Sequence, residues 1–196
     1  MIEDHQLPDI DIRADSPVED VLKVGSVCNR SGHCSRFGAG YILPHEVKPI
    51  AEFLGISESE FLSKYAEPVV RFNTKTLRFR IAQVKDRPYG PCNLFEQETN
   101  DCRIHEVKPL YCRITNCSSK GKHLQQWFDV NHFVNRNDPQ SIREWDIVCQ
   151  VTDDVIPGGH VSDLVDDARL EQIRAFVDLK RPEHKDGDDE FVEVRL

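Results

Sequence analysis

The chain has 196 residues, of which 39% are hydrophobic and 30% are charged, a size and composition that predict one main hydrophobic core. Its 25 Lys and Arg residues stand against 34 Asp and Glu residues, which gives a formal net charge of −9. This charge argues against a general attraction to nucleic acid or to anionic lipid.

The sequence shows no membrane segment. No apolar run approaches the roughly 20 residues that a membrane-spanning helix needs. The first residues, Met1-Ile2-Glu3-Asp4-His5, lack the basic stretch and apolar stretch of a secretory signal. We therefore expect a soluble, cytoplasmic protein that does not bind membranes. Because a reducing cytoplasm makes structural disulfides rare, the seven cysteines favour metal ligation or redox chemistry.

The N-terminal part begins with an irregular segment. Residues 1–17 carry two prolines and five acidic residues without apolar periodicity, and we interpret them as an arm whose order depends on docking. A short helix is expected around Val18 to Val24. A glycine-rich loop then carries Cys28 and Cys34 and ends at Gly38-Ala39-Gly40. Loops of this kind suit ligands better than hydrophobic cores.

Two short helices are expected next. Apolar residues recur at helical spacing within Pro44 to Leu54. Because Pro49 would remove a hydrogen bond inside a helix, this helix either starts near Lys48 or bends there. Ser57 and Glu60 have the spacing of a capping box, which predicts the start of a second helix.

The following pattern is typical of β-strands. Hydrophobic residues occupy 69–72, and others alternate with arginine at 77–81, which predicts a hairpin joined near Asn73-Thr74-Lys75. Basic residues across this hairpin are opposed only by Asp86, and such a strip could dock an anionic partner or RNA. A solvated face is the simpler explanation, because no aromatic residue alternates with the charges in a recognisable RNA-binding motif. The basic residues are Arg71, Lys75, Arg78, Arg80, Lys85 and Arg87.

The C-terminal part contains two further predicted helices. Asp138-Pro139 has the residue types of an N-cap followed by a first helical residue. Ser162 predicts the start of a terminal amphipathic helix that continues to about Lys180. Residues 181–196 are expected to form a solvated acidic tail.

The segment from Pro88 to Lys122 differs from all of these. It holds four cysteines and little periodicity, so something other than apolar packing is expected to organise it. The predicted fold is a small, mostly helical α+β domain over residues 18–180, with one β-hairpin and an irregular cysteine-rich metal-binding lobe.

The cysteines are spaced more widely than the two-residue gaps of a zinc ribbon. Four thiolates that converge from separate loops can nevertheless close a tetrahedral zinc site or hold an iron–sulfur cluster. The alternative is a buried apolar thiol. Cys149 suits that alternative, because it is in helical phase with Ile142 and Trp145. The candidate metal ligands are Cys28, Cys34, Cys92, Cys102, Cys112, Cys117 and Cys149.

Three stretches carry a family resemblance. They are Cys28-Asn29-Arg30-Ser31-Gly32-His33-Cys34-Ser35, Pro91-Cys92-Asn93-Leu94-Phe95 and Cys102-Arg103-Ile104-His105-Glu106-Val107-Lys108-Pro109-Leu110-Tyr111-Cys112-Arg113. The chain resembles the YkgJ-type cysteine-cluster family over about Val27 to Ile173. The resemblance implies a zinc ion or an iron–sulfur cluster as cofactor.

The sequence departs from the pattern of that family in two places. Ser31 and Ser35 stand where the family has cysteines, and serine does not replace a thiolate ligand. If the full set serves two metal positions, the resemblance leaves one of them here. Cys117 lies beyond the usual family cysteine and is a candidate substitute ligand. The strongest candidates are Cys92, Cys102 and Cys112.

Charged and imidazole side chains accompany the cysteines. Basic neighbours would favour thiolates or balance the charge of a four-thiolate site; they are Arg103, Lys108 and Arg113. Histidine can also ligate a metal, although a surface or hydrogen-bonded role is commoner. The three weaker candidates of this type are His33, His45 and His105.

Three functions remain open from sequence. The first is a metal-binding accessory protein, structural or redox-active, that acts with a macromolecular partner, most simply another protein. The second is an iron-dependent enzyme that modifies a peptide or protein, and the number of protein ligands would distinguish it from the first. The third is a metal-free interaction module that uses the basic hairpin. No residue is assigned a catalytic role.

Overall fold

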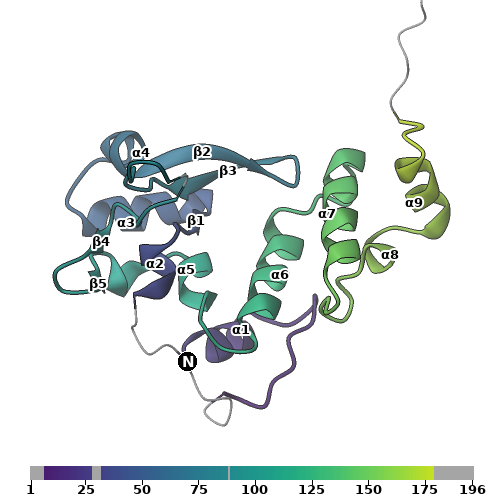
Figure 1. The fold of residues 1–196 in the computed structure, drawn as a ribbon, viewed down its shortest axis with the longest axis horizontal. Coiled ribbons are helices and arrows are strands. Elements are labelled where there is room, and N and C mark those ends of the chain that lie inside the picture. Colours follow the sequence, from purple (N-terminus) through teal and green to yellow (C-terminus); the bar gives the residue numbers. More distant parts are fainter. Residues whose placement is uncertain (1–6, 28–31, 88, 179–196) are drawn as a thin grey trace, which may run out of the picture.

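The computed structural model describes residues 7–27, 32–87 and 89–178, and it has the predicted α+β fold. The β-structure consists of a three-stranded antiparallel sheet and a two-stranded sheet. In Figure 1 the sheets lie at one end of the molecule and the helices of the C-terminal part lie at the other. In this described part of the chain, no helix is both long and apolar enough to cross a lipid bilayer.

The N-terminal segment packs against the C-terminal half. Ile12 and Ala14 are buried in the first hydrophobic core, and the backbone N–H of Ala14 donates to the carbonyl of Pro157 at 2.9 Å. Helix α1 (Val18–Gly25) confirms the first predicted helix. The limit between arm and domain at residue 17 stays a prediction.

The next elements explain how the chain accommodates Pro49. After α2 (His33–Arg36) and β1 (Tyr41–Ile42), a 3-10 turn, η2 (Pro44–Glu46), leads into α3 (Val47–Phe53). Pro49 therefore lies in the first turn of α3, where a backbone N–H has no helical partner to lose. Of the two alternatives, a start near Lys48 is the one that the structure shows.

Helix α4 and the hairpin follow in the predicted order. The Ser57 side chain accepts a hydrogen bond from the Glu60 backbone N–H at 3.2 Å and caps α4 (Glu58–Tyr65). Strands β2 (Ala66–Arg71) and β3 (Thr74–Phe79) then form the hairpin, and the sheet order is β1-β3-β2.

The hairpin turn overlaps the predicted position, near Asn73-Thr74-Lys75, at Asn73 and begins one residue earlier. The turn consists of Phe72 and Asn73, whose φ angles are 47° and 54°. Positive φ at both central residues is the geometry that matches the twist of two antiparallel strands across a two-residue loop. The ring of Phe72 is buried and packs edge-on against Trp145 at 5.3 Å, so its hydrophobicity reflects tertiary packing rather than a strand position.

The predicted cysteine-rich lobe is absent from the described residues. The segment instead contains β4 (Phe95–Glu96), β5 (Asp101–Cys102), η3 (His105–Val107) and α5 (Leu110–Ile114). Its apolar side chains belong to the two cores. Leu94 and Ile104 are buried in the second core, which α3, α4 and β3 also build, and Ile114 is buried in the first.

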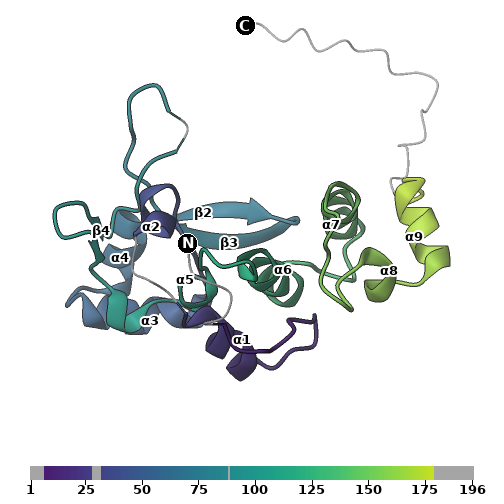
Figure 2. The ribbon, with the colours of Figure 1, turned by 60° about the horizontal axis from the view of Figure 1, so that its bottom comes forward.

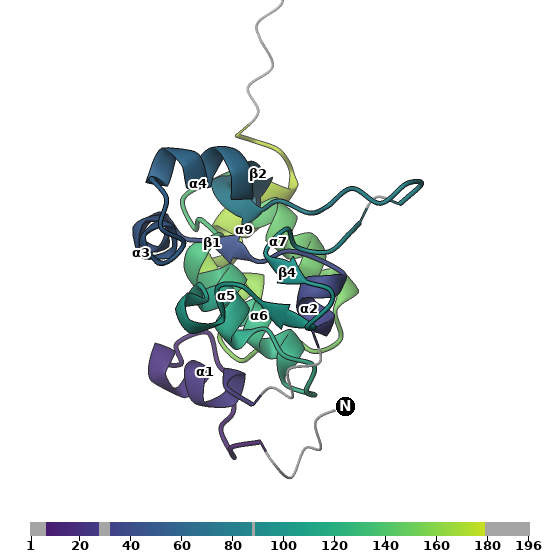
Figure 3. The ribbon, with the colours of Figure 1, turned by 90° about the vertical axis from the view of Figure 1, so that its left-hand side faces the viewer.

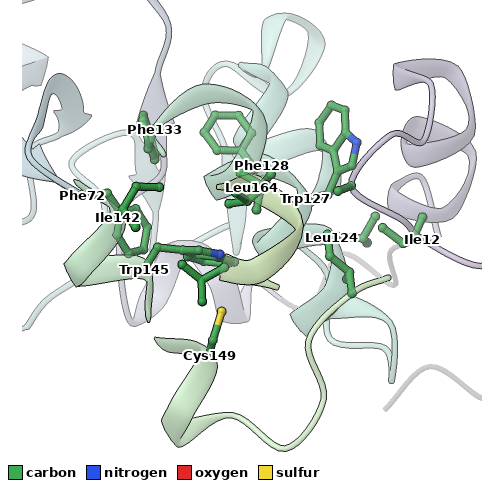
Figure 4. Close-up of a cluster of buried hydrophobic side chains, with 14 of the residues drawn as sticks. Ile12, Phe72, Leu124, Trp127, Phe128, Phe133, Ile142, Trp145, Cys149 and Leu164 are labelled. Atoms are coloured by element: carbon green, nitrogen blue, oxygen red, sulfur yellow. The ribbon is translucent and has the colours of Figure 1, made fainter. Parts of the chain in front are cut away.

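The first core is built around α6 (Gly121–His132) and α7 (Pro139–Val151). The Asp138 side chain accepts from the backbone N–H of Gln140 at 3.0 Å, which confirms the predicted cap of α7. Sequence analysis did not predict α6. Figure 4 shows Trp127 and Phe128 of α6 and Trp145 of α7 among the buried side chains of this core.

The terminal helix is divided in two. Helix α8 (Val161–Leu164) is capped by His160, and α9 (Asp167–Arg174) is capped by Asp166, whose side chain accepts from Arg169 N at 2.9 Å. The prediction of one helix starting at Ser162 was therefore wrong, because the cap at Asp166 restarts the helix. Residues 179–196, which include the predicted tail 181–196, lie outside the described residues.

Candidate metal centre

Five cysteines line one pocket of about 450 Å³: the exposed Cys117 and four cysteines from four separate segments. Cys34 lies on α2, Cys92 lies three residues before β4, Cys102 lies on β5 and Cys112 lies on α5. Figures 2 and 3 show α2, β4 and α5 in the same part of the molecule. The fold thus brings to one site residues as far apart in the chain as Cys34 and Cys112, which are separated by 78 positions.

Backbone hydrogen bonds join the segments that carry these cysteines. The Cys92 N–H donates to the carbonyl of Ser35 at 2.7 Å, which ties the loop before β4 to α2. Cys102 is paired with Phe95 across the small sheet, and the N–H of Arg103 donates to the carbonyl of Leu94 at 3.0 Å. The cysteine loops are therefore positioned by regular backbone pairing as well as by apolar packing.

Cys112 is held by close packing against glycine. A Cβ atom added at Gly40 would collide with Sγ of Cys112 and would lie 3.2 Å from the ring of Tyr111. The absent side chain at Gly40 is what makes room for this sulfur. Tyr111, the preceding residue on α5, packs edge-on against Tyr41 and Phe128, each at 5.0 Å, so the same helix contacts the first core.

Burial favours the protonated form of three of these thiols. It raises the pKa of Cys92 to about 11, and it also raises the pKa values of Cys102 and Cys112. The thiols affect one another as well: negative charge on Cys34, Cys92 or Cys102 raises the pKa of Cys112 further. Lys108 acts in the opposite direction on Cys102 and Cys112. A compensating positive charge, such as a metal ion, would favour the thiolate forms of Cys92, Cys102 and Cys112.

The comparison with family models agrees with this geometry. The model of the family described as "Putative zinc- or iron-chelating domain" matches residues 27–151. The chain belongs to this chelating-domain family. The matched region contains all seven cysteines, from Cys28 to Cys149. It therefore includes every cysteine that lines the pocket. No curated protein and no solved structure matches the chain.

The remaining candidate cysteines lie in different surroundings. Cys117 is exposed and also lines the pocket. Cys149 is 7% exposed in the first core, beneath Trp145 in Figure 4, and it does not line the pocket. Cys28 and Ser31 lie outside the described residues, and Ser35 contributes its backbone carbonyl to the contact with Cys92.

The candidate histidines and basic residues are dispersed. His33 lines the cysteine pocket, whereas His105 lies beside Asp101 at 4.0 Å. His45 follows Pro44 at the surface and is not among the described residues that line the cysteine pocket. Arg103 lies near Glu96 and the ring of Tyr65, and Arg113 lines a neighbouring hollow. Cys34, Cys112 and His105 also line that hollow, and Lys108 lines both it and the cysteine pocket.

The thiols share a pocket without yet forming a coordination sphere. Within residues 7–27, 32–87 and 89–178, no group of three or more His, Cys, Asp or Glu side chains is arranged to hold a metal ion. The donor set itself fits zinc or an iron–sulfur cluster, because both accept four thiolates. Ligation by the described cysteines would require their sulfurs to move closer together around the metal.

Gly40 was not among the candidate site residues predicted from the sequence. From the sequence, Gly38-Ala39-Gly40 was predicted only to end a loop, because Gly40 and Cys112, which approach closely in the fold, lie 72 positions apart in the chain. No local signal distinguishes Gly40 from Gly38, whose added Cβ would meet nothing closer than the Cys34 carbonyl at 3.9 Å.

Proposed function

We propose that this chelating-domain protein binds a zinc ion or an iron–sulfur cluster through Cys34, Cys92, Cys102 and Cys112. The observation that carries the proposal is the convergence of these four cysteines on one pocket from four segments of the chain. Cys28, which lies outside the described residues but within the matched region, is a further candidate ligand, and Cys117 at the same pocket is a weaker one.

The chemistry of the pocket suits such a group. A bound metal would supply positive charge that stabilises thiolates, and each thiol that becomes a ligand would release its proton. Lys108 would offset part of the negative charge of a four-thiolate site, because it already lowers the pKa values of Cys102 and Cys112. The lack of a side chain at Gly40 would leave space for the Cys112 sulfur.

The role that best suits this site is that of a structural or redox-active accessory factor, which acts in the cytoplasm with a macromolecular partner. A site closed by four thiolates leaves no position for a substrate. It would join α2, the segment around β4 and β5, and α5, which together contact both hydrophobic cores. Metal binding would thus stabilise the surface that a partner recognises.

A second candidate is an iron-dependent enzyme that modifies a peptide or protein. The volume of the pocket supports it: about 450 Å³ is more than one ion needs and is in the range of small-molecule sites. Cys34 is exposed, so the site also has an opening to solvent. In this case three protein ligands would leave a coordination position open.

One measurement separates these possibilities. The protein is purified without oxygen, and its visible absorption spectrum and metal-to-protein ratio are recorded on the same sample. A brown solution with several irons per chain would identify a cluster. A colourless protein with about one zinc per chain would identify a closed structural site. A folded protein without metal, stable in a strong chelator, would refute both.

Cysteine variants test the ligand set. Cys102→Ser is expected to lower the metal content and to destabilise the segment around β4, β5 and α5. Cys149→Ala serves as the control, because Cys149 is buried in the first core and does not line the cysteine pocket. It is expected to reduce stability while keeping the metal content. Unchanged metal content in Cys102→Ser would remove Cys102 from the ligand set.

A further inference from the structure

A second surface hollow, of about 340 Å³, lies beside the cysteine pocket and shares Phe37 with it. Three aromatic rings line this hollow. Phe37 follows α2, Tyr89 lies on the long loop after β3, and Phe95 begins β4. Phe37 and Tyr89 are 53% and 46% exposed, so two of these rings present much of their surface to solvent. We call this site the aromatic hollow.

Arginine side chains accompany the rings. The guanidinium carbon of Arg36 lies 5.7 Å from the centre of the Phe95 ring, and that of Arg87 lies 6.0 Å from the centre of the Tyr89 ring. Arg36 also donates a hydrogen bond to the side-chain oxygen of Asn100 at 2.6 Å, which fixes its position. Arg36 and Arg87 both line the hollow, and no acidic residue lines it.

Positive charge continues beyond the aromatic hollow. A neighbouring hollow shares Val84, Arg87 and Tyr89 with it and is also lined by Arg78, Arg80 and Lys85, together with the acidic Glu67 and Asp86. In the part of the chain that the structure describes, none of Arg80, Lys85 and Arg87 forms an ion pair. Their charges are therefore available, in contrast to those of Arg71 and Arg78, which pair with Asp129 and Glu67.

We propose that the aromatic hollow and the adjoining basic residues bind single-stranded nucleic acid. Unpaired bases would stack on Phe37 and Tyr89, and phosphates would contact Arg36, Arg87 and the neighbouring Lys85. Exposed aromatic rings beside arginines are the combination that sites for single strands use, because every base has a face that can stack.

The alternation of rings and cations favours nucleic acid over an acidic peptide. Two exposed rings on different segments line the aromatic hollow, Arg87 lies over one of them, Tyr89, and cations continue along the loop after β3. A nucleic acid strand repeats an aromatic group and an anion at every unit, whereas an acidic peptide needs only one apolar anchor and a charged rim. This surface goes beyond the proposed metal site and does not depend on it.

The structure removes the objection that the sequence raised. Along the chain, no aromatic residue alternates with the basic residues in a recognisable RNA-binding motif, but the fold brings Phe37 and Phe95 from other segments to the hollow that Arg87 lines. The net charge of −9 is no obstacle to a local site, although it predicts binding that weakens steeply with salt. Figure 3 shows the loop after β3 extending from the side of the molecule opposite α3.

The test uses the full chain as purified, with any metal it carries, and a fluorescein-labelled oligouridine of about 12 nucleotides. Fluorescence anisotropy measures the dissociation constant over a series of salt concentrations. Tyr89→Ala and Phe37→Ala are each expected to weaken binding about fivefold or more. A triple variant with Arg80→Gln, Lys85→Gln and Arg87→Gln is expected to reduce the slope of log K against log salt by about 2.

Matched variants on α3 serve as controls. Phe53 is an exposed aromatic residue at 48%, and Lys48 is an exposed cation on the same helix. Phe53→Ala and Lys48→Gln are expected to leave the dissociation constant unchanged. The proposal would be overturned by any of three results. One is that the protein does not bind the labelled oligouridine at low salt, and another is that the Tyr89→Ala and Phe37→Ala variants bind it as tightly as the wild type. The third is that a mixed Glu/Phe peptide displaces the labelled oligouridine at a lower concentration than unlabelled oligouridine does. The last result would identify a protein partner instead.

Discussion

Arg71 on β2 and Asp129 on α6 form a bidentate ion pair between the sheet and the helices of the first core. Nε of Arg71 donates to Oδ1 of Asp129 at 2.8 Å, and Nη2 donates to Oδ2 at 2.5 Å. The Asp129 side chain is 7% exposed, so its charge depends on this partner. The guanidinium also lies 4.7 Å from the ring of Phe72 in the hairpin turn.

Removal of Arg71 therefore has a clear expected result. Arg71→Ala leaves the Asp129 carboxylate buried and unpaired, which is expected to lower the free energy of unfolding by about 3 kcal/mol. Arg78→Ala on the neighbouring strand is the matched control, because its pair with Glu67 is more exposed and is expected to contribute about 1 kcal/mol or less. Urea denaturation of both variants measures the difference, and equal losses would contradict the structural role of Asp129.

A second ion pair makes the packing of α9 on α7 depend on pH. Arg174 donates to both carboxylate oxygens of Asp146, at 2.7 and 2.8 Å, and this hydrogen bonding lowers the pKa of Asp146. A lowered pKa in the folded state means that the carboxylate stabilises the fold above the unfolded pKa of about 4. That stabilisation is lost as the pH falls through the lower, folded value.

Asp146→Asn is thus expected to destabilise the protein at neutral pH by about 1 to 2 kcal/mol, since it removes a charge-assisted hydrogen-bonded pair. The difference from the wild type is expected to disappear in acid, where the wild-type carboxylate is protonated. Denaturation midpoints across the acid range measure this. A constant difference at every pH would show that the substitution acts through packing rather than charge.

Some helices could be predicted from the sequence because a capping residue marks where they start. The capped helices α4 and α7 were predicted because Ser57 and Asp138 mark their starts. Helix α6 was missed although Leu124, Trp127 and Phe128 have helical spacing, because no side chain caps its start. The terminal helix was predicted too long, because its apolar spacing continues across the extended residue Val165.

The candidate site was less predictable than the helices. The sequence identified the cysteines as candidate ligands, but it did not show which of them line the same pocket. That depends on how α2, the β4–β5 pair and α5 pack together. The contact between Gly40 and Cys112 and the placement of Lys108 at the thiols are products of the same packing. The helical phase of Cys149 with Ile142 and Trp145 was a correct indication of burial in the first core.

The metal-free protein is expected to lose stability in alkali. Burial raises the pKa of Cys92 to about 11 in the folded state, above its unfolded value of about 8.5. The folded state therefore holds this proton more tightly, so the contribution to stability is full below the unfolded pKa and is lost as the pH rises toward 11. Denaturation of chelator-treated protein between neutral and alkaline pH measures the loss, and Cys92→Ala is expected to reduce it. Alkaline stability equal to neutral stability would contradict the burial of this thiol.

The contact between Gly40 and Cys112 offers the sharpest test of the metal site. Gly40→Ala introduces a Cβ where the Cys112 sulfur lies, so the sulfur must move and the metal content is expected to fall. The control is Gly38→Ala, because its Cβ would meet nothing closer than 3.9 Å. Neither glycine has a positive φ, so backbone strain does not separate the two variants. Metal-to-protein ratios and circular dichroism are measured on both. Full metal content in Gly40→Ala would show that Cys112 is not a ligand, whereas loss in both variants would indicate a general effect of the loop.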